Sequence, residues 1–142
     1  MTDALKSLTE TTYDSVEGYR KAAEKADSPA LKTALNQRRE KREQTLKTLN
    51  AELTRQGADA VSSGTAQGAA HRLWVDITDM FERGDEAAAE RVEEGEDHLA
   101  GEFKSALDRQ DLDPAERDIV QTCYTEISAG ERFGDIIEKQ YD

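Results

Sequence analysis

The sequence predicts an all-α protein, a bundle of four long helices with an additional shorter helix between the second and the third. Apolar residues recur at helical spacing in four long segments, and a fifth, shorter pattern lies between them. The chain has only 2 prolines and few β-branched runs, which disfavours strands. Its 142 residues are enough for one domain with its own core, so we expect residues 1–142 to form a single bundle domain.

The first long helix is expected from about residue 3 to residue 26. "DSPA" then ends it and begins the second, because Ser28 is a favourable N-cap and Pro29 suits a first helical turn. The second helix should end near Gln56, where Gly57 is a natural C-cap. The inward stripe of the first helix consists of Leu5, Leu8, Thr12, Val16, Tyr19, Ala23 and Ala26.

Two arginines interrupt the apolar stripe of the second helix. With Leu31 at 0° and about 100° per residue, the later leucines of this segment fall within about 60° of one another. Arg38 and Arg42 fall in the same arc, at about −20° and +20°. The helical period therefore places two cations on the face that should be buried.

The shorter pattern, residues 66–81, follows the loop "GADAVSSGT" and is about 24 Å long at 1.5 Å per residue. A helix of this length can carry the chain back along the bundle, which leaves the second and third long helices parallel. That arrangement is the ferritin-like one. Trp74 lies in the arc of Leu73, Ile77 and Phe81, so we expect its indole to be buried.

Two further segments complete the bundle. In "RGDE", Gly84 is expected to end the crossover helix and Asp85 to cap the next helix, which runs over about residues 86–109. In "DLDPAE", Asp113 is the expected N-cap of the last helix and Pro114 lies in its first turn. The inward stripes are Ala88, Val92, Glu96, Leu99, Phe103 and Ala106, then Ile119, Cys123, Glu126, Gly130, Phe133, Ile137 and Tyr141.

Each of these two helices places one glutamate on its inward stripe, near its midpoint. With Val92 at 0°, Glu96 falls at about 40°. With Ile119 at 0°, Glu126 falls at about −20°. Buried charges need partners, and the arginine fork suits a carboxylate. We therefore expect a cross-helix layer in which Arg38 and Arg42 neutralise Glu96 and Glu126 inside an otherwise apolar core.

The composition excludes several functional classes. A formal charge of −12 repels phosphate backbones and anionic lipid, so binding to nucleic acid or to a membrane surface is not expected. No stretch approaches the roughly 20 apolar residues of a membrane span, and no signal peptide is visible. A lone cysteine, Cys123, excludes an intramolecular disulfide, and we expect a cytoplasmic protein.

The stretches "SGTAQGAAHRLWVD", "ERVEEGEDHLAGEFKSAL" and "YDSVEGYRKAAEKADSPALK" resemble an uncharacterised bacterial family of ferritin-like four-helix bundles, a domain of unknown function. The resemblance covers nearly the whole chain and is densest around His71, Arg72, Trp74 and Asp76. It implies the fold and a bacterial, cytoplasmic setting, and the family has no established activity. One departure is Val16, where members of the family often have glutamate.

The motif around Trp74 has two interpretations. It is a recognition element at the start of the crossover helix, or Trp74 packs that helix onto the bundle while His71 and Arg72 bond to nearby carboxylates.

A di-iron centre is the metal site typical of ferritin-like bundles. It needs a Glu-x-x-His pair on each of two helices. The chain has only His71 and His98, and the residues three positions before them are Gly68 and Gly95. The sequence therefore predicts no resident cofactor and no catalytic residues.

The sequence leaves two hypotheses for the function. The first is a non-enzymatic bundle that acts through protein–protein contacts, as a homo-oligomer or with another protein. The alternative is a ferritin-like, iron-binding oxidase or iron-handling protein, with a site assembled between subunits from surface carboxylates.

Overall fold

The computed structural model describes residues 2–65 and 69–141, and every regular element in these ranges is an α-helix. Four helices are long and two are short. They are α1 (Thr2–Lys25), α2 (Pro29–Arg55), α3 (Ala69–Val75), α4 (Ile77–Glu82), α5 (Asp85–Asp108) and α6 (Pro114–Gln140). The all-α prediction is thus confirmed, and the bounds of the four long helices agree with it to within one or two residues.

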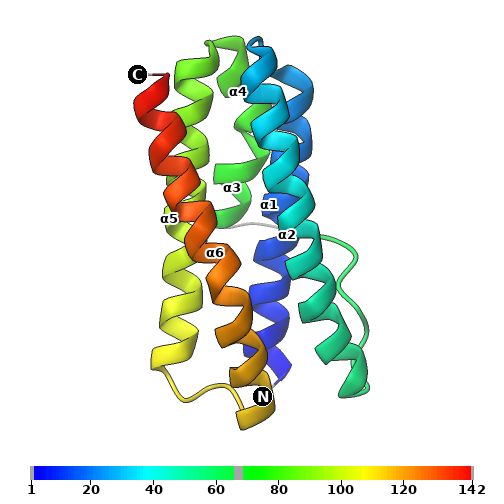
Figure 1. The fold of residues 1–142 in the computed structure, drawn as a ribbon. Coiled ribbons are helices and arrows are strands. Elements are labelled where there is room, and N and C mark those ends of the chain that lie inside the picture. The colour runs from blue at the N-terminus through cyan, green and yellow to red at the C-terminus, as the bar shows by residue number, and fades with distance from the viewer. Residues whose placement is uncertain (1, 66–68, 142) are drawn as a thin grey trace.

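The four long helices lie side by side, with α1 against α2 and α5 against α6 (Figure 1). α2 and α5 run in the same direction. The carboxylate of Asp85, at the start of α5, accepts hydrogen bonds from the backbone N–H groups of Asp27 (3.0 Å) and Ser28 (2.9 Å), just before α2. The segment between α2 and α5 therefore returns along the length of the bundle.

The crossover differs from the prediction, because it contains two short helices where one was expected over residues 66–81. Ala66 lies outside the described residues. The interruption is at Asp76, whose ψ angle of −2° is far from the usual helical value of about −42°. Within the described residues the Asp76 side chain makes no capping hydrogen bond, so the change in backbone angle alone separates α3 from α4. Trp74 and Ile77, on either side of the break, are both buried.

Three helix ends follow the rules that the sequence indicates. Ser28 caps α2 by accepting from the N–H of Leu31, and Pro29 is its first residue. Gly57, just after α2, has a φ of +86°, which glycine tolerates best. Asp113 caps α6 in a reciprocal capping box with Glu116.

The prediction that Asp85 caps α5 is wrong. Gly84 occupies the N-cap position with a φ of +110°, and Asp85 is the first residue of the helix. Its carboxylate is therefore free to bind the turn between α1 and α2, as described above.

The core consists of two apolar clusters at different heights in the bundle. One contains Tyr19, Leu35, Trp74, Val92 and Ile137, and reaches the crossover helices. The other is built mainly from leucines and phenylalanine of the opposite half, including Leu5, Leu49, Leu53, Leu99 and Phe103. The buried charged residues Arg38, Arg42 and Glu96 lie between these clusters.

Candidate functional site

Arg42 is the centre of a buried network between the two apolar clusters. Its Nη1 and Nη2 donate to the two carboxylate oxygens of Glu96, each at 2.8 Å, in a bidentate pair. Its Nε donates to Oε1 of Glu126 at 2.7 Å. Arg42 and Glu96 are both 0% exposed, so this ion pair has no solvent-accessible surface. A pair of this geometry is the strong form of an arginine–carboxylate interaction.

Arg38 completes the network from one turn earlier on α2. Its Nη2 donates to Oε2 of Glu126 and, at 3.4 Å, to the backbone carbonyl of the same residue. Arg38 is 7% exposed and Glu126 is 16% exposed. The structure therefore brings all four residues of the expected layer together, and Glu126 is the member nearest to solvent.

The protonation states of Arg42 and Glu126 follow from the contacts that these two residues make. Burial would lower the pKa of Arg42, but the charge and hydrogen bonds of Glu96, with help from Glu126, raise it well above its usual value. Burial would likewise raise the pKa of Glu126, but Arg42 and Arg38 together lower it. The guanidinium and the carboxylate therefore both stay charged, and the four formal charges of the layer cancel.

α1 supports the network with uncharged groups. Ser15 accepts a 3.0 Å hydrogen bond from Nη1 of Arg42, and its own hydroxyl donates to the carbonyl of Thr12. The guanidinium carbon of Arg42 lies 5.7 Å from the centre of the Tyr19 ring, in a cation–π contact. α1 therefore adds one hydrogen bond and an aromatic face without adding charge.

Gly130 on α6 is a member of the site that the sequence analysis placed on the inward stripe without a role. A Cβ atom at this position would lie 1.9 Å from Oε2 of Glu96 and 2.3 Å from Nη2 of Arg42. Only glycine leaves room for the ion pair. A glycine in the middle of a helix is costly, and this is the signal that could have identified it.

The donor set of the layer does not fit a di-iron centre. All four carboxylate oxygens of Glu96 and Glu126 accept from guanidinium groups. Two arginines stand where a metal ion would need ligands, and their charge repels a cation. His98, a possible imidazole ligand, instead contacts Glu102 through Nε2 at 2.7 Å on the half-exposed side of α5.

The motif at the start of the crossover is divided between the interior and the surface. Trp74 is buried, His71 is half-buried, and Arg72 and Asp76 are exposed. Burial raises the pKa of the Asp14 carboxyl on α1, although hydrogen bonds from Thr65 and, to a smaller extent, nearby His71 lower it. Within the described residues, Arg72 forms no salt bridge. The expected bond between Arg72 and a carboxylate is thus not seen among these residues and stays a prediction.

Two glycines form the slot that receives Trp74. A Cβ atom at Gly18 of α1 would lie 2.4 Å from the indole, and one at Gly95 of α5 would lie 2.7 Å from it. The ring also packs against Tyr19, with ring centres 5.3 Å apart. The indole therefore holds the crossover between α1 and α5, in agreement with the packing interpretation.

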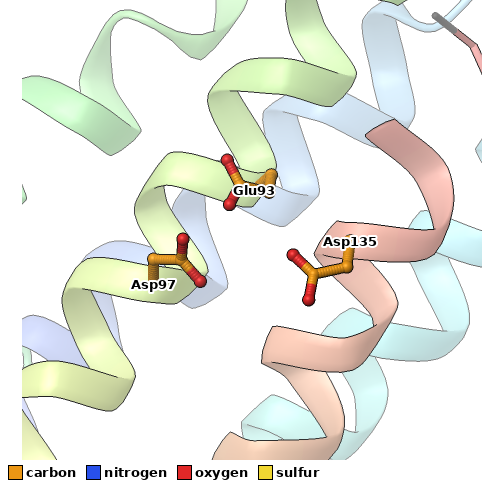
Figure 2. A group of neighbouring side chains, drawn as sticks. All are labelled: Glu93, Asp97 and Asp135. Carbon is orange, nitrogen blue, oxygen red and sulfur yellow. The ribbon is translucent and has the colours of Figure 1, made fainter. Parts of the chain in front are cut away.

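A second cluster of charged groups lies on the surface, along the seam between α5 and α6. The carboxylates of Glu93, Asp97 and Asp135 face one another there, with oxygens within 4.8 Å (Figure 2). The helices approach closely, since a Cβ atom at Gly134 would lie 3.0 Å from Cα of Glu93. The hydrogen bond to Asp97, together with partial burial, raises the pKa of Glu93 to about 8. Three oxygen donors of this kind match the ligand preference of hard divalent cations.

Each helix of the described ranges is too short or too polar to cross a bilayer.

Comparison with known proteins gives one match. Neither the curated proteins nor the solved structures contain a match to this chain. The model of one family, described as a domain of unknown function (DUF2383), matches residues 1–109. This range contains Arg38, Arg42 and Glu96 but ends before α6, which supplies Glu126. Since it covers well over half of the sequence, the chain belongs to the DUF2383 family.

Proposed function

We propose that this protein is a non-enzymatic, ferritin-like bundle that acts through protein–protein contacts. The observation that carries the proposal is the occupation of the two central glutamates, Glu96 and Glu126, by Arg42 and Arg38. In a ferritin-like enzyme the carboxylates at this height hold the metals. Here they balance two cations instead.

The assignment of the bundle as ferritin-like rests on topology. α2 and α5 are parallel, and a helical crossover joins them, which is the connection expected of that fold. We place the protein in the bacterial cytoplasm, as the family resemblance implies. The lone Cys123 supports this setting: it is buried, and burial raises the pKa of its thiol to about 11, so it is an unreactive core residue.

Elemental analysis tests the proposal. Protein purified without a tag should contain less than stoichiometric iron, before and after incubation with ferrous iron under air, and should consume no oxygen beyond the buffer. Stoichiometric iron with oxygen consumption would overturn the proposal.

The seam of α5 and α6 favours one second candidate, a metal-handling protein that binds cations on its surface. Three carboxylates from two helices already converge there. Titration with ferrous iron and with calcium, followed by calorimetry, tests it. Binding that disappears in Asp97→Asn but survives in Asp111→Asn, a matched exposed aspartate on the loop after α5, would establish this candidate.

A further inference from the structure

The face formed by α2 and α6 differs from the rest of this acidic surface. It lies toward the viewer in Figure 1, where the two helices run side by side. Two adjoining hollows of about 460 and 240 Å³ open on it, and both are bordered by Arg38 and Lys41. Their walls are mainly threonine methyl groups and small side chains, such as Thr48, Thr125 and Ala129.

Among the described residues, only one carboxylate borders these hollows, and it is not available for new contacts. That group is Glu126, which is already ion-paired with both arginines. The chain as a whole has 31 acidic residues and a net charge of −12. Two copies would therefore repel each other at most orientations. On the α2–α6 face, two copies can come into contact without placing their carboxylates against each other.

The most exposed large apolar side chain in the described part of the protein lies beside the hollows. Ile136 is 61% exposed, and it follows Ala129 by seven residues and Phe133 by three on α6. Residues at these spacings share one side of a helix. Phe133 and Ala129 border the two hollows, so Ile136 extends the same face toward the end of α6.

We infer that the α2–α6 face is a self-association surface, on which Ile136 of each copy packs into the hollows of a second copy. A two-fold contact satisfies this, because the same patch then supplies both the protruding side chain and the hollow. The inference rests on the proposed function and specifies its partner as another copy of this chain. No charged group has to lose its existing partner when the contact forms.

The size of the face sets the expected strength. From Ala34 to Thr48 it extends about 21 Å along α2, and two adjacent helices are about 20 Å wide. Each copy therefore contributes on the order of 400 Å², which belongs to the small, transient class of interfaces. We expect a dissociation constant in the range of about 10 to 500 μM.

Sedimentation velocity of the full chain between about 5 and 500 μM tests the inference. Wild-type protein should show a monomer–dimer equilibrium, and added NaCl should strengthen the dimer because it screens repulsion between two acidic copies. Ile136→Glu should weaken dimerisation by roughly ten- to one hundredfold. Thr125→Glu, at the mouth of the larger hollow, should have a similar effect.

Val75→Glu is the matched control, since Val75 is the other exposed large apolar residue in the described part of the chain, 43% exposed on α3. This variant should dimerise as the wild type does, and circular dichroism should show that all three variants keep their helices. A monomer throughout the concentration range, or an equal loss in Val75→Glu, would overturn the inference. Either result leaves the proposed function standing with a different partner, whereas iron-dependent oxygen consumption would remove that function whatever the oligomeric state.

Discussion

At the scale of single residues, Arg42 is the residue on which most buried charge depends. Arg42→Met removes four hydrogen bonds and leaves Glu96 buried without a cation. We expect the free energy of unfolding to fall by about 3–5 kcal/mol, measured by urea denaturation. Replacing Glu96 with leucine as well removes the unpaired charge and should recover most of the loss, since Glu126 keeps Arg38 as its partner.

The control for this pair of variants is Arg39→Met. Arg39 forms a partly exposed pair with Glu43 one turn away, so the change should cost less than about 1 kcal/mol. If the double variant is no more stable than Arg42→Met alone, Arg42 and Glu96 do not depend on each other.

Gly130 gives a second residue-scale prediction. Glycine-to-alanine changes inside helices usually stabilise a protein by up to about 1 kcal/mol. Gly130→Ala should do the opposite and cost about 1–3 kcal/mol, because the new methyl group would overlap Glu96 and Arg42. Gly101→Ala on α5 is the matched control, since nothing lies within 4 Å of its added Cβ and it should stabilise. Thermal unfolding of both variants measures the change in melting temperature. Equal changes in the two variants would contradict the predicted overlap at Gly130.

At the scale of elements, the crossover depends on Trp74. Trp74→Ala empties the slot between Gly18 and Gly95 and should cost about 3–5 kcal/mol in denaturant unfolding. The wild-type indole should fluoresce at the short wavelengths typical of an apolar site. Emission close to that of free tryptophan in water would show that the crossover does not pack as described.

The seam between α5 and α6 should make stability depend on pH. The folded chain holds the Glu93 proton up to about pH 8, whereas an unperturbed glutamate releases it near 4.5. The free energy of unfolding should therefore fall as the pH rises between these values. Glu93→Gln should flatten this part of the profile and stabilise the protein at pH 8. Urea midpoints at several pH values measure it, and a profile unchanged by the substitution would show that another group is responsible.

At the scale of the whole molecule, the net charge of −12 favours expansion of the chain. Neutral salt screens exposed charges over about 10 Å at 0.1 M but has little effect on a buried pair such as Arg42–Glu96. The melting temperature should therefore rise as NaCl is added at low protein concentration, where self-association is absent. A fall would indicate that surface ion pairs outweigh the repulsion.

The helical period predicted which residues face inward on α1, α2 and α5, whereas on α6 the buried stripe is shifted toward Val120 and Ile127. It placed Arg38, Arg42, Glu96 and Glu126 on buried stripes because that placement needs only position along one helix. The same reasoning supplied the caps at Ser28 and Asp113, which are local features. These parts of the fold and of the layer could be predicted because their causes lie within a single segment.

Other features depend on how close two helices come, which a one-dimensional pattern does not contain. Gly18, Gly95 and Gly130 matter because a specific side chain from another helix occupies the space beside them. Asp85 has the right identity and position for a cap, but it bonds across the bundle to the preceding turn. The carboxylate seam at Glu93 likewise arises only when α5 and α6 are adjacent.

Because the ion network lies between two apolar clusters, each half of the interior is closed at its inner end by polar groups. Unfolding of one half would expose Arg42 and Glu96 to water. Their rehydration would then recover part of the desolvation free energy that burial costs. A partial opening is therefore less costly here than in a continuous apolar core of the same length. The two halves of the bundle should accordingly behave as separate cooperative units, each able to exchange its amide protons while the other stays folded.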